Sequence, residues 1–250
     1  MSCPVLIVAH PGHELRLFGW MCAVRPIVCI LTDGSGSTGA ARTRYSLELL
    51  EKCGASAGPV MGRMSDKLWY SAILEGNSDP FLQAADDIRS AADLGSLVLA
   101  DPVEGYNPMH DLSAAIADRV ASLVGGERAT YPLIDTRDGG TVLRLDSEAA
   151  MRKQAAVTAY SPLADEVRAL SPAGESELHV ERLLPEAFAW PETFGSRPRY
   201  ETFGADRAAA GTYGQVITYA RHVRPIAQRL RTERPPGATP GKPAHVFHRT

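Results

Sequence analysis

Residues 4–9 read Pro-Val-Leu-Ile-Val-Ala, an unbroken apolar run that ends directly at His10. A run of this length and composition is typical of a strand that is buried on both faces of a sheet. Two similar runs follow, Pro-Ile-Val-Cys-Ile-Leu at 26–31 and Ser-Leu-Val-Leu-Ala at 96–100. The three runs predict neighbouring strands of a parallel sheet.

Helical patterns separate these strands, and a fourth strand is expected at 131–134. The strands therefore alternate with helices, which indicates an α/β fold, a Rossmann-like parallel sheet flanked by helices. Active sites in such sheets form at the carboxyl ends of the strands, so we expect the chemistry there. The expected helices of the first half cover 14–24, 42–53, 79–92 and 111–124, the last capped by Asp111.

The second half of the chain is less regular, with a loop-rich stretch over 171–204. We expect a single domain over 1–232, in which 1–135 form the core sheet and 136–232 form a less regular helical extension. The proline-rich segment 233–250 is expected to be a flexible tail. The elements expected in the extension are a turn at 137–140, an apolar stretch at 141–145 and helices at 147–160, 162–170 and 207–230, with Ser147 as a cap.

Composition and charge exclude several classes of function. The chain has 250 residues, 26 Lys and Arg against 29 Asp and Glu, and a formal net charge of -3. This balance does not indicate a strongly basic nucleic-acid surface. No apolar run approaches the roughly 20 residues needed to cross a bilayer, and the N-terminal residues lack the basic region of a signal peptide. We expect a cytoplasmic protein without a membrane span, acting on a small molecule, with a homo-oligomer possible.

Four cysteines are spread over the first half of the chain, at Cys3, Cys22, Cys29 and Cys53. Two lie in or beside expected strands and two lie in expected helices, and no pair has the CxxC spacing. We interpret them as reduced, mostly buried thiols. A nucleophilic cysteine is disfavoured, because no His or Asn is adjacent to any of them.

Histidines gather at the expected strand ends. His10 and His13 lie in the turn Ala-His-Pro-Gly-His-Glu at 9–14, directly after the first strand. His110 lies in Glu-Gly-Tyr-Asn-Pro-Met-His-Asp at 104–111, a second turn between a strand and a helix. Three imidazoles converging on one sheet edge would make an open divalent-metal site of the kind that catalytic zinc uses. Ordinary loop histidines are the alternative interpretation.

Three ordered motifs resemble the LmbE/PIG-L family of N-acetyl-sugar deacetylases. The chain has AHPGHE at 9–14, LTDG at 31–34 and EGYNPMHD at 104–111, where the family commonly has AHPDDE, TDG and a stretch such as EGGHPDHD. The order and spacing fit across about residues 4–160, and a weaker likeness extends over 200–225. The resemblance implies a metal-dependent deacetylase that uses zinc or another divalent metal.

The resemblance also assigns roles to individual positions. It implies metal ligands at His10, His13 and His110, with His13 standing where the family has an aspartate. Gly12 stands where the family has its general base, and glycine cannot transfer a proton. Asn107 stands where the family has a histidine that stabilises the oxyanion, and asparagine can still donate a hydrogen bond there.

A substitute for the missing base must come from a nearby carboxylate. The candidates are Glu14, Asp33, Glu104 and Asp111. Glu14 alternatively caps a helix, and Asp33 alternatively forms a turn or accepts a hydrogen bond from a ligating histidine. Glu104 and Asp111 flank the third histidine and are candidates for contact with metal, water or substrate.

Candidate substrate-binding residues are Arg42, Glu104, Tyr106 and Trp69. Arg42 matches a position where the family often has an arginine near the substrate, although a solvated helix charge is equally consistent. Tyr106 replaces a glycine of the family motif and would cover the pocket. Trp69 would stack on a sugar ring, with packing in the core as the alternative.

Taken together, these features predict a metal-dependent amide hydrolase with a remodelled site. Its substrate would be an acylated, most simply acetylated, amino sugar or sugar-bearing metabolite. Two alternatives remain open from the sequence. One is a catalytically silent relative that binds a sugar or nucleotide-like ligand, and the other is a metal enzyme with other hydrolytic or isomerase chemistry.

Overall fold

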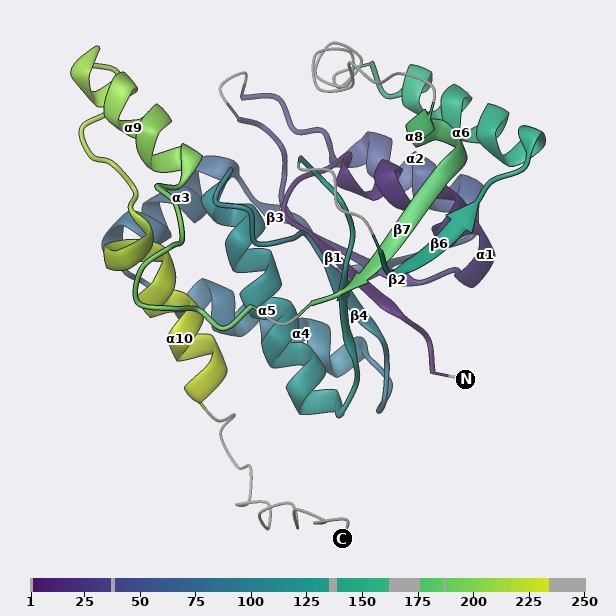
Figure 1. The fold of residues 1–250 in the computed structure, drawn as a ribbon, viewed down its shortest axis with the longest axis horizontal. Helices are drawn as coiled ribbons and strands as arrows, with labels where there is room; N and C mark the ends of the chain where they lie inside the picture. The colour runs from purple at the N-terminus through teal and green to yellow at the C-terminus, as the bar shows by residue number, and fades with distance from the viewer. Residues whose placement is uncertain (1, 37–38, 135–138, 162–175, 187, 234–250) are drawn as a thin grey trace, which may run out of the picture.

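The computed structural model describes residues 2–36, 39–134, 139–161, 176–186 and 188–233. It confirms the α/β fold, a central seven-stranded sheet with helices on both faces (Figure 1). In order across the sheet, the strands are β3 (Ser56–Met64), β2 (Ile27–Thr32), β1 (Val5–Val8), β4 (Val98–Ala100), β5 (Arg128–Thr130), β7 (Val180–Pro185) and β6 (Thr141–Arg144).

The sheet contains the expected parallel strands and, in addition, an antiparallel pair that was not expected. β1 pairs parallel with β2 and β4, and the pairs β2–β3 and β4–β5 are also parallel. β7 runs antiparallel to β5, and β6 runs antiparallel to β7. The first half of the chain therefore builds five parallel strands, and the extension adds an antiparallel pair to one edge.

Helices form a layer on each face of the sheet. Figure 1 shows α1, α2 and α6 on one side and α3, α4, α5 and α10 on the other. The helices are η1 (His13–Leu17, a 3-10 helix), α1 (Phe18–Val24), α2 (Thr43–Cys53), α3 (Asp66–Glu75), α4 (Asp79–Ala91), α5 (Pro108–Val124), α6 (Ser147–Ala159), α8 (Ser176–His179), α9 (Arg199–Ala209), η3 (Tyr219–Val223, a π-helix) and α10 (Arg224–Thr232).

The apolar run of β1 is explained by its place at the centre of the sheet. Its side chains alternate between two hydrophobic cores, one on each face. Val5 and Ile7 belong to the core beneath α3, α4, α5 and α10. Leu6 and Val8 belong to the core beneath η1, α1 and α2. All four residues are fully buried, so neither face of the strand tolerates a polar side chain.

Several expected boundaries differ from the structure. The strand expected at 131–134 instead covers Arg128–Thr130, because that segment pairs with β4. α5 begins at Pro108 with Asn107 as its cap, so Asp111 lies inside the helix rather than capping it. α6 is capped by Asp146, whose side chain accepts from the Ala149 N–H, rather than by Ser147.

The extension contains elements that its loop-rich sequence did not indicate. β7 and the first half of α9 lie within the stretch expected as loop. The helical stretch expected at 207–230 is divided among the end of α9, η3 and α10. β3 and α3 were also not expected. The predictions for 162–170, the first half of the turn at 137–140 and the tail beyond Glu233 fall outside the described residues. The division into one domain and a tail stays a prediction.

A buried ion pair attaches the extension to the N-terminal part of the chain. Lys153 of α6 and Glu181 of β7 lie 2.9 Å apart, and both side chains are almost fully buried. Glu181 Oε1 and Oε2 also accept the backbone N–H groups of Gly19 and Trp20, each at 2.8 Å. Lys153 Nζ donates to the Arg16 carbonyl at 3.1 Å. The pair therefore fixes the junction between η1 and α1, which follows the turn that carries His13.

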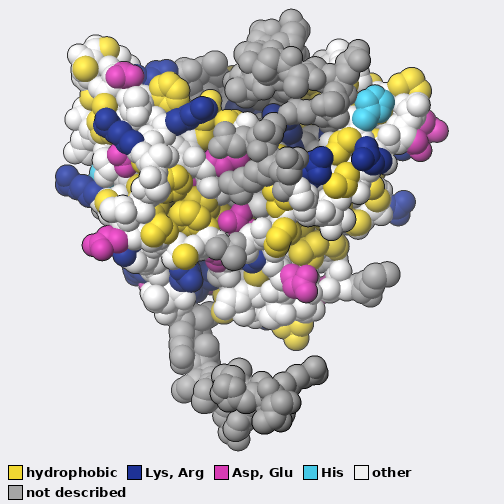
Figure 2. All heavy atoms as spheres, in the orientation of Figure 1, with side chains coloured by type: hydrophobic (Ala, Val, Ile, Leu, Met, Phe, Trp, Pro, Cys, Tyr) yellow, Lys and Arg dark blue, Asp and Glu magenta, His cyan; other side chains and the backbone are white. Residues whose placement is uncertain are grey.

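The molecular surface carries both signs of charge. On the face shown in Figure 2, basic and acidic side chains are interspersed rather than gathered by sign. Among the described residues, no helix combines the length and the apolar character needed to span a bilayer.

Candidate metal centre and active site

The ends of four neighbouring strands supply the side chains of the site. His10 lies two residues beyond β1, and Thr32 is the last residue of β2. Asp66 opens α3 shortly after β3, and Asp101 directly follows β4. These positions share the carboxyl edge of the parallel strands, where sites in α/β sheets form.

Three histidine rings converge at this edge. The ring centroids lie 5.4 Å apart for His10 and His13, 5.3 Å for His10 and His110, and 4.6 Å for His13 and His110. His13 opens η1, and His110 lies in the first turn of α5. The structure thus brings together the three histidines that the sequence singled out.

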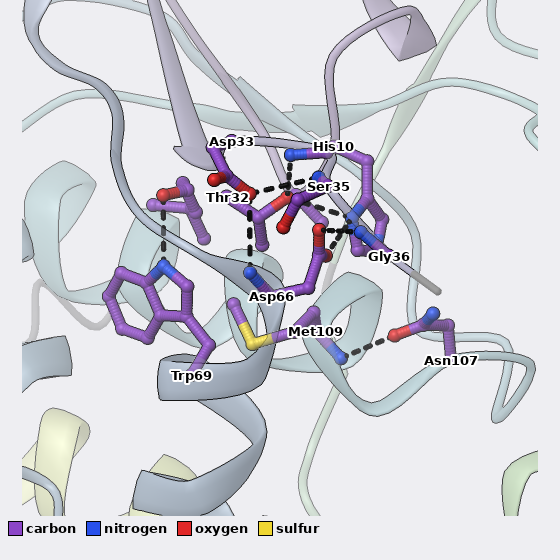
Figure 3. A network of polar contacts seen from close by, with 12 residues as sticks. His10, Thr32, Asp33, Ser35, Gly36, Asp66, Trp69, Asn107 and Met109 are labelled. Atoms are coloured by element: carbon purple, nitrogen blue, oxygen red, sulfur yellow. Dashed lines mark hydrogen bonds and ion pairs between the residues drawn. The ribbon is translucent and has the colours of Figure 1, made fainter. Parts of the chain in front are cut away.

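His10 is oriented by two partners, Thr32 at the end of β2 and Asp66 at the start of α3 (Figure 3). Its Nδ1 lies 3.0 Å from Asp66 Oδ1 and 2.9 Å from Thr32 Oγ1. A carboxylate can only accept, so the proton of a neutral His10 ring belongs on Nδ1 and the lone pair on Nε2. His10 Nε2 is buried and has no hydrogen-bond partner among the described residues. This nitrogen is therefore available as a ligand.

Asp66 is itself held in place as an ionised group. Its Oδ2 accepts the backbone N–H of Gly36 at 2.8 Å. Burial raises the pKa of the Asp66 carboxyl, but the hydrogen bond from His10 and the His10 charge outweigh that effect, and Gly36 and Thr32 assist them. The net effect is a pKa of about 2 for the Asp66 carboxyl. Asp66 is an acceptor for the His10 proton at neutral pH.

His13 has the same arrangement on the opposite side of the cluster. Its Nδ1 lies 2.9 Å from Oδ2 of Asp101, which also accepts the Ala9 N–H at 2.8 Å. The Tyr131 hydroxyl donates to Asp101 Oδ1. Burial raises the pKa of Asp101, but the electrostatic effect of the nearby His13 and His110 rings and the hydrogen bonds from His13 and Tyr131 outweigh it and lower the pKa to about 2. The proton of a neutral His13 therefore also belongs on Nδ1, which leaves its Nε2 to face a ligand.

His110 is the most buried of the three histidines. The residue is 4% exposed, and its Nδ1 has no partner among the described residues. Burial lowers the pKa of His110 well below its ordinary value, and the nearby His13 and His10 lower it further against the opposing effect of Asp101. The ring is therefore neutral at pH 7, the form that ligates a metal.

These atoms fit a divalent metal. Ligand atoms of His13, Asp101 and His110 all lie within 4.8 Å of one another. The two unpartnered ring nitrogens of His10 and His110 are a further sign, because buried polar atoms are nearly always hydrogen-bonded unless an ion or water completes them. In zinc sites, a histidine commonly binds the metal through one ring nitrogen and donates a hydrogen bond to a carboxylate from the other.

Asn107 and Tyr106 border the cluster from the loop before α5. The Asn107 Oδ1 accepts the Met109 N–H at 2.8 Å and the Tyr70 O–H at 3.0 Å, so its amide N–H₂ is the end left to donate. The Tyr106 ring stacks on His110 at 6.0 Å between centroids, and the Arg199 guanidinium lies 5.8 Å from the Tyr106 centroid. Tyr106 therefore lies directly against one of the three clustered histidines.

Two of the four candidate carboxylates are buried beneath the loops rather than exposed in the site. Glu14 is fully buried, its Oε2 accepts the Gly12 N–H at 2.7 Å, and burial raises its pKa. Asp111 is also fully buried, and its Oδ1 accepts the N–H groups of Glu104 and Gly105, both at 3.1 Å. Burial raises the pKa of Asp111 to about 8. Each carboxylate therefore stabilises the backbone conformation of a loop that borders the site.

The other two candidate carboxylates also bind backbone amides. Asp33 Oδ1 accepts the N–H groups of Ser35 at 2.9 Å and Asp66 at 3.3 Å, the pattern of a turn-forming aspartate. Glu104 Oε2 accepts the Ile134 N–H at 3.3 Å. A catalytic role for these four carboxylates stays a prediction.

The remaining expected substrate residues differ in their surroundings. Arg42 caps α2 and is partly buried, and its backbone N–H donates to the Asp33 carbonyl at 2.8 Å. Trp69 is 2% exposed, packs on Phe81, and donates from Nε1 to the Leu31 carbonyl at 2.9 Å (Figure 3). This burial corrects the expected stacking role, because Trp69 has no exposed face to offer a sugar.

Gly12, in the turn between β1 and η1, has a backbone conformation that requires glycine. Its φ is 110° and its ψ is -19°, a conformation that only glycine adopts without strain. Its N–H is also the donor to Glu14. An aspartate placed at this position would have to strain the turn or reshape it.

We therefore expect Gly12→Ala and Gly12→Asp each to lower the free energy of unfolding by about 1–3 kcal/mol, measured by urea denaturation. Gly195→Ala is the matched control, because its backbone lies outside the positive-φ region and a Cβ would meet nothing within 4 Å. Equal stability of the Gly12 and Gly195 variants would show that the turn bears no such strain.

Asp66 and Asp101, the two carboxylates that contact the histidines, lie outside the motifs that the sequence shows. Asp101 directly follows a predicted strand at the expected edge, and that placement was a usable signal. Asp66 follows β3, whose sequence contains Gly58, Pro59 and Gly62. These residues are tolerated because β3 is an edge strand with register shifts against β2.

Comparison with known proteins gives two structural neighbours. No protein-family model and no curated protein match the chain. The A40926 pseudoaglycone deacetylase Dbv21 is 16% identical, with a TM-score of 0.48 over 73% of this chain and 96% of that one. The zinc-inhibited form of the teicoplanin deacetylase Orf2 is 13% identical, with a TM-score of 0.42 over 73% of this chain and 97% of that one.

Proposed function

We propose that this protein is a divalent-metal-dependent amide hydrolase of the LmbE/PIG-L type. Its substrate would be an acylated, most simply acetylated, amino sugar or sugar-bearing metabolite. The observation that carries the proposal is the convergence of His10, His13 and His110, with a carboxylate on Nδ1 of two of the rings. The substrate class rests on the three ordered motifs of the sequence.

Within this proposal the three histidines hold the metal, and zinc suits an all-imidazole donor set. Asp101 is better suited to orienting His13 than to ligation, because its two oxygens already accept from Ala9, His13 and Tyr131. Asp66 does the same for His10. When bound, the metal supplies Lewis-acid polarisation of a carbonyl and makes a water molecule more acidic.

The residues around the cluster would position the substrate. The Asn107 amide N–H₂ would donate to the carbonyl oxygen of the scissile amide as negative charge develops on it. The Tyr106 ring would form one wall of the sugar subsite, and Arg199 beside it would reach hydroxyl or acidic groups. Among the described residues, a proton acceptor is the least well supplied part of the site. Gly12 has no side chain, and Glu14, Asp33, Glu104 and Asp111 all bind backbone amides.

That scarcity specifically favours a second candidate function, in which the protein binds an acylated sugar through the same metal centre without hydrolysing it. A positioned base ordinarily contributes ~100- to 10,000-fold to such a reaction. A protein that lost its base and kept its metal would retain binding and lose turnover. Both functions use the same metal site, but only the hydrolase cleaves the amide and releases acetate.

One experiment separates them. The full-length protein is loaded with zinc, and acetate release from N-acetylglucosamine and its 4-nitrophenyl glycoside is measured beside calorimetric binding of the same sugars. The hydrolase predicts acetate release that falls at least ~100-fold after treatment with a chelator and returns with zinc. Metal-dependent binding without acetate release supports the second function. Absence of both binding and release contradicts the two functions together.

A further inference from the structure

Two cysteine thiols from different helices lie in direct contact. Cys22 lies on α1, and Cys53 is the last residue of α2. Their sulfur atoms are 2.7 Å apart, across a sequence separation of 31 residues. Unbonded heavy atoms ordinarily rest about 3.5–4.0 Å apart, and a disulfide bond measures about 2.0 Å. The two helices therefore place the thiols in direct contact, within reach of a disulfide bond.

We propose that Cys22 and Cys53 form a site of reversible oxidation, at which a low-molecular-weight disulfide such as oxidised glutathione converts the two thiols into a disulfide that links α1 to α2. Both residues are free thiols in the structure. The link would need a small closing movement of the two sulfurs, because their side chains already face one another.

The surroundings of the two thiols assign them different parts in the reaction. Cys22 is partly exposed, whereas Cys53 is 5% exposed, so the oxidant meets Cys22 first. The contact with Cys53 lowers the pKa of the Cys22 thiol against an opposing effect of burial, and the positive charge of Arg152 lowers it further. Cys22 is thus the better source of the thiolate, which is the attacking form.

The exchange proceeds in two balanced steps. The Cys22 thiolate attacks one sulfur of oxidised glutathione, which forms a mixed disulfide and releases one glutathione thiolate. The Cys53 thiol then loses its proton and attacks the Cys22 sulfur, which forms the Cys22–Cys53 bond and releases the second glutathione. Each cysteine gives up one electron and one proton, and the two glutathione molecules leave as thiols.

The other two cysteines provide internal controls. Cys3 lies near backbone oxygens, with its sulfur 3.6 Å from the Arg25 carbonyl, and Cys29 is fully buried in β2. Burial raises the pKa of the Cys29 thiol to about 12. Neither has a sulfur contact among the described residues, so neither is expected to form an internal disulfide.

The link would join two segments that both support the site. α1 continues directly from η1, which begins at His13, and α2 is preceded by its cap residue Arg42, whose N–H donates to the Asp33 carbonyl. Closing a loop of about this size in the unfolded chain commonly stabilises a protein of this length enough to raise its Tm by roughly 5–10 °C. The oxidised form should therefore be the more heat-resistant one.

The test uses the full-length protein, reduced, freed of reductant and equilibrated with mixtures of reduced and oxidised glutathione. Differential alkylation and peptide mass spectrometry should find Cys22 and Cys53 in one disulfide-linked peptide pair, with the number of free thiols falling from four to two. The Tm should rise in the wild type and in the matched control Cys3→Ser, and it should not rise in Cys22→Ser or Cys53→Ser.

The wild-type peptide map alone decides the pairing, so the proposal stays testable if a serine variant fails to fold. Four free thiols after equilibration with excess oxidised glutathione would overturn it. So would glutathione left attached to Cys22 with Cys53 still free, or a disulfide that involves Cys3 or Cys29.

Discussion

Replacing His110 with alanine is expected to weaken zinc binding by more than 100-fold, measured by competition with a chromogenic chelator. Changing a partner behind a metal ligand costs about 10- to 100-fold in affinity, so removing a ligand itself should cost more. His110 is the most buried of the three histidines, which leaves water little room to replace its nitrogen. Acetate release, where the wild type shows it, should fall in parallel.

The matched control is His179→Ala, which removes a histidine from α8 without touching the cluster. Its zinc affinity should equal that of the wild type. Circular dichroism of the metal-free proteins would separate loss of the site from loss of the fold. Unchanged zinc affinity in a folded His110→Ala protein would disprove ligation by this residue and with it the three-histidine site.

Glu181→Gln is expected to cause the largest loss of stability, about 3–5 kcal/mol in the free energy of unfolding. The neutral amide would leave the buried Lys153 ammonium without its counter-ion. Only one amide oxygen would remain to accept from Gly19 and Trp20, which now bind separate oxygens of the carboxylate. Urea denaturation with matched m-values would measure the change.

The double variant Lys153→Met with Glu181→Gln is the informative control. Removing the ammonium along with the carboxylate abolishes the unpaired charge, so part of the lost stability should return. The exposed Glu192→Gln should be nearly neutral. A Glu181→Gln protein as stable as the wild type would mean that the ion pair does not hold the extension in place.

The parallel part of the fold could be predicted from the sequence because its strands are buried on both faces. β1, β2 and β4 read as unbroken apolar runs, and only a strand between two helical layers requires that composition. β3 and β7 lie nearer the edges, where partly exposed side chains and backbone breaks are allowed. Their sequences consequently resemble loops, and the antiparallel pair was missed.

The site was only half predictable for a related reason. His10, His13 and His110 carry a motif, since their spacing around two turns is fixed by the sequence. Asp66 and Asp101 carry none, because their roles depend on which strands become neighbours in space. Trp69 was assigned to the site by residue type, although burial against Phe81 decided its place. A short motif identifies residues that lie close together in the sequence. Partners that come from different strands can be identified only once the order of the strands in the sheet is known.

The position of β7 has a consequence for the order in which the protein can be completed during synthesis. β5 ends at Thr130, but its antiparallel neighbour begins at Val180, so roughly 50 residues must still be added before that edge is covered. At ~5–20 residues per second this interval lasts about 3–10 s. During it, β5 presents unpaired backbone groups to other nascent chains, the exposure that promotes aggregation. The carboxyl-terminal third of the chain therefore covers the exposed edge of β5 only late in synthesis. The yield of soluble protein should depend on how soon that part of the chain is made.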